Sequence, residues 1–409
     1  MSDAAGETRR VALPLLVTLA VQMLVAFAVY CAPVMAPVAG PALGVSASAV
    51  GYYIAASYFG SMISSAAAGG WIARFGPIRA SQAGLALCLA GLCLAASAWL
   101  PLVLLGGFVV GLGYGPTTPA SSVILVRAAP PSIFALVFSI KQTGVPAGGV
   151  LAGLFVPMLI LAFGWQWGAV VIGACCVLLA LALSAVRARY DINLDPRAPV
   201  SLLSALAPVR MVFGDRKLRQ MCIAGFVYGG VQITLVTYLV TFLVESFALT
   251  LVLAGLVMAV SQVASVAGRV LWGVLADRVF ARRTMLGLLG LGMGVSSLAA
   301  LSADPGWSRG LLFTYAALFG ASAVGWNGVW LAEIARLAPG RASEATGGCL
   351  FFTFLGVVVT PPLFNAVLAL TSNYSAAYAI FGFPALAVGI WLLLRRGEGP
   401  VFPVRIPKP

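Results

Sequence analysis

The sequence predicts an all-α membrane protein with twelve transmembrane helices in two pseudo-symmetric six-helix bundles. Three observations predict it. Of the 409 residues, 61% are hydrophobic and the mean hydropathy is +1.05, far above the values of soluble domains. Apolar runs of about 20 residues recur along the whole chain, and each can cross a hydrocarbon core about 30 Å thick. Lysines and arginines gather at alternate ends of these runs.

The apolar runs must be helices, because lipid offers no partners to backbone N–H and C=O groups and the runs lack the alternation of barrel strands. The first run is too long for a signal-peptide core and no cleavage pattern follows it, so we expect it to stay as the first span. The predicted spans are residues 11–36, 47–73, 78–99, 101–126, 133–160, 165–186, 219–244, 249–275, 284–303, 309–335, 343–370 and 374–394.

A polar segment, residues 187–218, separates an N-terminal bundle (1–186) from a C-terminal bundle with a short tail (219–409). Its part 201–212 is predicted to form a surface helix. With a cytoplasmic N-terminus, Arg309 is the one basic residue at an outer end, Lys141 and Arg269 lie within spans, and every other Lys and Arg faces inward. We therefore expect a multi-pass protein of the cytoplasmic (inner) membrane with both termini in the cytoplasm. The net charge of +13 reflects this topology, and no nucleic-acid partner is expected.

The two halves of the sequence repeat each other. "VRAAP" at 126–130 matches "ARLAP" at 335–339, an offset of 209 residues, and "GWIARFGPIR" at 70–79 parallels "GVLADRVFARR" at 273–283. Gln22 and Gln232 also correspond. Two such six-helix units facing each other enclose a cavity at the membrane midplane, which opens alternately to the two sides.

The stretch 273–283 resembles the signature loop of the major facilitator superfamily, Gly-x-x-x-Asp-Arg followed by basic residues, and the chain as a whole resembles its bacterial members. The resemblance implies the major facilitator fold. In the first copy Arg74 stands where the family has an acidic residue. Asp277 and Arg278 are expected to form a latch between the halves, with an ordinary topology anchor as the alternative.

Arg269 and Lys141 are cations at unusual depth. Arg269 lies eight residues before Asp277, which is about 12 Å along a helix, and Lys141 is at a similar depth in the fifth span. Such charges need a partner or a water-filled cavity. Either they bind a substrate carboxylate, or Glu333 in the tenth span pairs with Arg269, Lys141 or Arg336. Glu333, Arg336 and Arg127 join Asp277 and Arg278 as candidates for gating or coupling.

Two further resemblances bear on the substrate. Arg269 with Gly273 is similar to the eighth-span arginine of monocarboxylate transporters and oxalate/formate exchangers, which implies a carboxylate ligand. "GVPAGG" at 144–149 resembles a fifth-span motif of exporters, with close helix packing and a proline bend as the alternative. Polar and aromatic residues on the predicted cavity helices complete the candidate substrate site: Gln22, Tyr30, Tyr114, Gln232, Tyr238, Gln262, Ser265, Trp326 and Asn327.

These features predict a secondary transporter of a small organic anion, with a monocarboxylate as the expected cargo and proton coupling left open. The alternative is an efflux transporter for drugs or other apolar compounds. The sequence has no histidine, no phosphate-binding loop and seven scattered cysteines without metal-ligand spacing, so we expect neither an enzyme nor a cofactor or metal. The expected partners are the substrate, a possible coupling proton and the lipid bilayer, and the expected state is a monomer.

Overall fold

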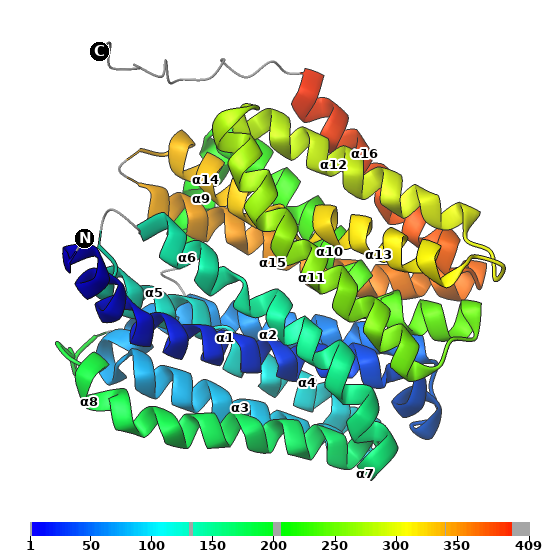
Figure 1. Cartoon of the computed structure of the whole chain (residues 1–409), viewed down its shortest axis with the longest axis horizontal. Helices are drawn as coiled ribbons and strands as arrows, with labels where there is room; N and C mark the ends of the chain where they lie inside the picture. Colours follow the sequence, from blue (N-terminus) through cyan, green and yellow to red (C-terminus); the bar gives the residue numbers. More distant parts are fainter. Residues whose placement is uncertain (1, 131–133, 199–205, 340, 395–409) are drawn as a thin grey trace.

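The computed structural model describes residues 2–130, 134–198, 206–339 and 341–394, which are helical nearly throughout (Figure 1). The N-terminal half comprises α1 (Ser2–Ala42), η1 (Ala47–Ala49), α2 (Val50–Phe75), α3 (Pro77–Ala96), α4 (Leu100–Tyr114), α5 (Thr117–Ala128), α6 (Phe134–Gln142), α7 (Gly144–Ala182), η3 (Leu183–Val186) and α8 (Arg187–Tyr190). The C-terminal half comprises α9 (Leu206–Gly214), α10 (Arg216–Phe247), α11 (Leu251–Arg278), α12 (Arg282–Ala299), η5 (Ala300–Ser302), α13 (Arg309–Ala323), α14 (Asn327–Leu337), α15 (Ala342–Thr371) and α16 (Tyr374–Leu394).

These helices supply twelve membrane-crossing segments. Nine helical stretches of the described residues have the length and apolar composition of spans. The longest stretch, Val137–Tyr190, turns back at Gly164, whose φ of 79° is a backbone conformation that glycine adopts readily. This stretch therefore supplies two crossings. Helix α2 and the α13–α14 pair complete the set. The predicted all-α, twelve-span fold class is confirmed.

Three predicted spans are interrupted rather than continuous. The fourth is divided between α4 and α5 at Gly115–Pro116, the tenth between α13 and α14 at 324–326, and the fifth between α6 and α7 at Thr143. The first two breaks occur in helix pairs that correspond in the internal repeat. The α4–α5 pair begins at Leu100 and the α13–α14 pair at Arg309, and the pairs end at Ala128 and Leu337, so both ends differ by the offset of 209 residues. Residues 201–205 of the predicted surface helix lie outside the described residues, and Leu206–Gly214 is helical.

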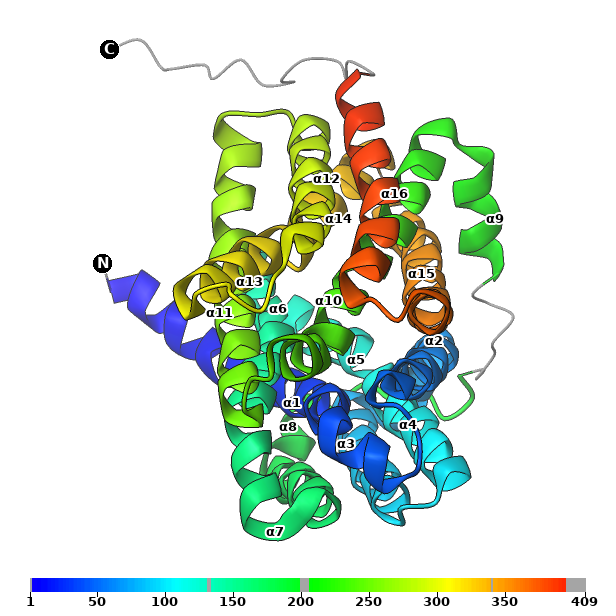
Figure 2. The same ribbon diagram turned by 90° about the vertical axis from the view of Figure 1, so that its right-hand side faces the viewer.

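The helices form two groups (Figure 2). Within the N-terminal half, α1 packs on α7 and α3 packs on α4 and α7, while in the C-terminal half α10 packs on α15 and α12 on α16. The halves meet along three pairs of helices: α7 with α11, α2 with α15, and α1 with α10. We call the end of the molecule that carries residues 187–198 and 206–215 the linker end, and the end that carries the α1–η1, α10–α11 and α15–α16 connections the opposite end.

The two halves are packed tightly at the opposite end. Gly153 of α7 and Gly255 of α11 are in such close contact that a Cβ on either would meet the carbonyl oxygen of the other. Ser48 Oγ donates to Asn365 Oδ1 across the same interface at 2.6 Å. Toward the linker end a cavity of about 220 Å³ lies between α2 and α15, lined by Met62, Ser65, Ala66, Gly347, Leu350, Phe351 and Phe354, and by Pro208 of α9. The interface is therefore closed at one end and looser at the other.

Candidate functional site

Arg269 lies at the interface of the two halves, about five turns after the start of α11 at Leu251. Its Nη1 donates to the carbonyl oxygen of Gln142 at 3.0 Å, and its Nε donates to the carbonyl oxygen of Val324 at 3.3 Å. The first acceptor belongs to the N-terminal half and the second to the C-terminal half. The guanidinium thus bridges the two bundles through main-chain groups.

Both acceptors are available because the helices that carry them are interrupted. In a continuous helix the carbonyl of residue 142 would accept from the N–H of residue 146, but Pro146 has no N–H. Val324 lies in the break between α13 and α14, beyond the last residue of α13. Non-helical carbonyls at membrane depth are tolerated where they line a cavity or bind a charge. Within the "GVPAGG" stretch, Pro146 therefore leaves the Gln142 carbonyl without its helical partner, while Gly148 and Gly149 pack closely against α1 and α11.

Lys141 is held within the N-terminal half, on the last turn of α6. Its Nζ donates to Gln22 Oε1 of α1 at 2.9 Å and to Thr118 Oγ1 of α5 at 3.3 Å, and Thr118 Oγ1 itself donates to Gln22 Oε1 at 3.2 Å. The side chain is only 2% exposed. Lys141 and Arg269 are close enough for their charges to repel each other. The Lys141 ammonium group, which donates to Gln22 and Thr118, therefore adds to the positive electrostatic potential near Arg269.

Glu333 does not neutralise either deep cation. The sequence left Arg269, Lys141 and Arg336 open as ion-pair partners of Glu333. In the structure the partner is Arg336, which donates through Nε and Nη2 to the two Glu333 carboxylate oxygens at 2.8 Å each. Within the described part of the chain, no carboxylate forms an ion pair with Arg269 or Lys141. The centre of the interface consequently holds two basic side chains whose hydrogen-bond partners are neutral groups.

Three tyrosines lie beside the cations. The hydroxyls of Tyr30 and Tyr58 are 3.3 Å apart, and the ring of Tyr58 meets that of Tyr114 edge-on with centroids 6.0 Å apart. Tyr30 and Tyr114 both lie within electrostatic range of Arg269. Tyr58 also contacts Phe354 of the C-terminal half, with ring centroids 6.4 Å apart. Tyr58 and Thr118 were missed by sequence reasoning, although Thr118 lies only two residues after Pro116 of the Gly115–Pro116 break.

A second polar group is formed in the C-terminal half. Gln232 Oε1 of α10 accepts from Trp326 Nε1 at 3.0 Å and from Asn327 Nδ2 at 3.1 Å. Trp326 is fully buried, whereas Gln232 and Asn327 are partly exposed. The structure thus brings Gln232 together with Trp326 and Asn327, which lie 94 and 95 positions further along the sequence. Gln22 and Gln232, related by the repeat, both act as hydrogen-bond acceptors at the break of a neighbouring span.

Three other predicted substrate residues take part in packing. Tyr238 donates to the Pro361 carbonyl at 2.7 Å, and its hydroxyl lies against Gly51 at the closed interface. Ser265 Oγ donates at 2.7 Å to the carbonyl oxygen of Gln262 in its own helix. Gln262 is 1% exposed and packs against Gly149 of α7. In this conformation none of the three is open to a ligand, because the halves are closed over them.

The gating candidates lie at the linker end. Asp277 is exposed and pairs with Arg282 of its own half at 3.2 Å. Among the described residues it forms no ion pair with the other half, so the expected latch contact is not present in this conformation. Arg278 is exposed, and Arg127 Nη1 donates to the Ile192 carbonyl at 3.5 Å.

An acidic residue of the linker caps α3, the helix that follows the first signature copy. Asp191 accepts from the backbone N–H groups of Ile78 at 2.7 Å and Arg79 at 3.2 Å, at the start of α3. A carboxylate there is favoured by the free N–H groups and the positive end of the helix dipole. Sequence reasoning missed Asp191 because it lies more than a hundred residues from the helix that it caps.

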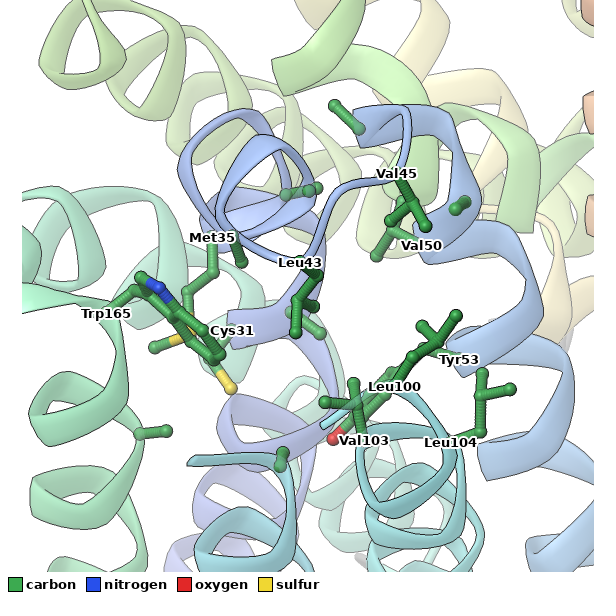
Figure 3. A pocket seen from close by; sticks show the side chains of 18 of the residues that line it. Cys31, Met35, Leu43, Val45, Val50, Tyr53, Leu100, Val103, Leu104 and Trp165 are labelled. Carbon is green, nitrogen blue, oxygen red and sulfur yellow. The ribbon is translucent and has the colours of Figure 1, made fainter. Parts of the chain in front are cut away.

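A separate cavity opens between α1, α2, α4 and α7 at the opposite end (Figure 3). Its walls are apolar, with Met35, Leu43, Val50, Val103 and Trp165 among the lining side chains, and no charged residue among those that line it. The cation pair does not line this cavity. It therefore offers nothing to an anion, although an apolar molecule could occupy it.

Comparison with known proteins identifies the kind of molecule. A family model described as Major Facilitator Superfamily matches residues 18–347. Among solved structures, the chain is similar to the E. coli fucose:proton symporter FucP (20% identity, TM-score 0.63, covering 95% of this chain and 100% of that one) and to a D-xylose-proton symporter (16%, 0.73, 93% and 96%). It is also similar to a POT family transporter in complex with a thioalcohol-conjugated peptide (15%, 0.72, 93% and 95%). No curated protein sequence matches the chain.

Proposed function

Since the chain belongs to the major facilitator superfamily, a family of membrane transporters, we propose that it is a secondary transporter of a small organic anion, with a monocarboxylate as the cargo. The observation that carries the proposal is the pair of uncompensated cations at the centre of the interface. Main-chain carbonyls and amide or hydroxyl oxygens orient Arg269 and Lys141 without cancelling their charge. A buried charge without a counter-ion is costly, and a bound anion would offset that cost.

The chemistry around the cations supports an anion over a cation or a sugar. Arg269 retains N–H groups beyond the two used for carbonyls, and guanidinium is suited to a planar carboxylate. The neighbouring hydroxyls of Tyr30, Tyr58 and Tyr114 add donors, while the described residues place no carboxylate in the group. The site is thus rich in donors and positive charge.

The remaining parts of the proposal concern coupling and location. Two of the solved structures to which this chain is similar are proton symporters, and for that reason the proposal includes a coupled proton. The distribution of Lys and Arg supports the cytoplasmic membrane with the linker end inward. Asp277, Arg278, Arg127 and the Glu333–Arg336 pair, all at the linker end, are proposed as gating residues, and a single chain is proposed as the transporting unit.

Substitution of Arg269 by Gln tests the proposal. A charge-assisted hydrogen bond is worth about 1.5–3 kcal/mol, so the uptake efficiency of Arg269→Gln proteoliposomes should fall about 10- to 150-fold. Arg309→Gln removes an exposed arginine at the opposite end and should leave uptake unchanged. Uptake of radiolabelled carboxylates, with thermal unfolding as a check on folding, makes the comparison. Full carboxylate uptake by Arg269→Gln would reject the assignment of this residue.

A carrier of apolar compounds is the second candidate, and the apolar cavity of Figure 3 is the observation that favours it. Competition separates the two functions. If the cargo is an organic anion, simple carboxylates should compete for uptake into proteoliposomes and lipophilic cations should not. The reverse pattern would favour the second candidate.

A further inference from the structure

A second cationic cavity lies at the linker end of the N-terminal half, apart from Arg269 and Lys141. It measures about 520 Å³ and lies between the first part of α1, the end of α5 and the segment that follows α7, which gather at the left of Figure 1. Its lining residues are Pro14, Ile124, Arg127, Ala128, Ala129, Pro130, Arg189, Tyr190 and Ile192. Two arginines and an otherwise largely apolar wall therefore share one cavity.

Both arginines are held in place by neutral groups. Arg127 Nη1 donates to the Ile192 carbonyl at 3.5 Å, and the Arg189 guanidinium lies 5.7 Å from the centroid of the Tyr190 ring. In the described part of the chain neither arginine forms an ion pair. The adjacent acid, Asp191, is occupied with the N–H groups at the start of α3. The cavity thus retains its positive charge.

Tyr190 supplies a further donor. Its hydroxyl is buried, and it has no hydrogen-bond partner among the described residues. A buried hydroxyl without a partner costs free energy, so a ligand that accepts a hydrogen bond at this position would be stabilised. The lining residues thus include two guanidinium groups and one hydroxyl, which are donors of the kind that bind phosphate oxygens.

We propose that this cavity binds the phosphate of an anionic phospholipid headgroup. The walls from Pro14, Ile124 and Ala128 are apolar and belong to membrane-spanning helices, so they suit a phosphate that is joined to a glycerol and acyl chains better than a free phosphate ion. The bound lipid joins the end of α5 to residues 189–192 at the start of the linker. This site is independent of the cargo that the central cations carry.

Lipid binding to the purified full-length chain tests the site. The probe is phosphatidylglycerol, added to protein in a neutral detergent, with phosphatidylcholine and inorganic phosphate in parallel arms. The readouts are thermal stabilisation and the number of lipids retained in native mass spectrometry. We expect phosphatidylglycerol to stabilise the protein and the other two probes to have little effect. Stabilisation by inorganic phosphate without any by phosphatidylglycerol would overturn the lipid assignment.

The variant Arg127→Gln/Arg189→Gln should bind phosphatidylglycerol about 25-fold more weakly, from about a fivefold loss at each arginine. Arg216→Gln/Arg219→Gln removes two exposed charges at the start of α10 and serves as the matched control, with binding expected to be unchanged. If the double variant does not fold, Tyr190→Phe, which removes one buried hydroxyl, should still show weaker binding. Wild-type affinity in the folded arginine variant, or an equal loss in the control, would refute the site.

Discussion

Arg269 shows how a transporter can keep a charge inside a membrane protein. Its guanidinium is oriented by two carbonyl oxygens that bear partial charges only, so its position is fixed while its positive charge remains. A carboxylate partner would have fixed the position and removed the charge. Glu333 instead forms an ion pair with Arg336. Under the proposed function, this difference leaves Arg269 available to a substrate carboxylate.

Lys141 provides the residue-scale prediction for the same site. Lys141→Met keeps the length of the side chain and removes its charge, so the Michaelis constant for a carboxylate should rise about 5- to 50-fold through the lost electrostatic attraction. The measurement is concentration-dependent uptake in proteoliposomes. Lys217→Met, which removes an exposed lysine of α10, is the control. An unchanged Michaelis constant in Lys141→Met would exclude a contribution of this ammonium to binding.

Gly76 is required by the carboxylate of Asp191. Its φ is 98°, and a Cβ at this position would meet the Asp191 side chain. Gly76→Ala should therefore lower the stability of the protein by about 1–3 kcal/mol through backbone strain and loss of the cap. Gly69→Ala, in the helical part of α2 where nothing lies within 4 Å, should be neutral or slightly stabilising. Thermal unfolding of both variants checks this, and equal unfolding temperatures would contradict it.

At the scale of elements, the helix breaks build the site. The α4–α5 and α13–α14 breaks place Thr118 and Val324 beside Lys141 and Arg269, and the α6–α7 break exposes the Gln142 carbonyl. Continuous helices would have used the Gln142 and Val324 carbonyl groups in their own backbone hydrogen bonds. The breaks follow from glycine and proline: Gly115–Pro116 in one span, Pro146 in another, and Gly325 in the third.

Pro146→Ala tests the freed carbonyl. The alanine N–H can bond to the Gln142 oxygen and compete with Arg269, so uptake efficiency should fall about tenfold. Pro384→Ala, on the exposed side of α16, alters a helix of the same protein far from the cations and should have no such effect. Uptake kinetics of the two variants are to be compared. Normal uptake by Pro146→Ala would mean that this acceptor is dispensable.

At the scale of the whole molecule, the halves are closed at the opposite end and looser at the linker end. Alternating access requires the closed interface to open. Ser48 and Asn365 face each other across it, so the Ser48→Cys/Asn365→Cys variant should form a disulfide that fixes the halves. We expect uptake to stop on oxidation and to return on reduction, whereas each single variant should stay active. Normal uptake by the cross-linked protein would show that this interface does not need to separate.

The sequence by itself determined the fold class. Membrane helices satisfy their own backbone groups, so hydropathy, the alternation of Lys and Arg, and the repeat at an offset of 209 residues were sufficient to predict twelve spans in two halves. The sequence also pointed to Arg269 and Lys141, because charged residues within apolar runs are visible without a structure.

Only the tertiary structure decided what surrounds those charges. Whether Arg269 meets Glu333 or two carbonyl oxygens depends on how helices distant in the sequence pack, and apolar patterns do not specify that. For the same reason, Tyr58, Thr118 and the cap from Asp191 were found only in three dimensions. Hydrophobicity acts without direction and sets which segments enter the membrane, whereas hydrogen bonds are short and directional and depend on the final packing.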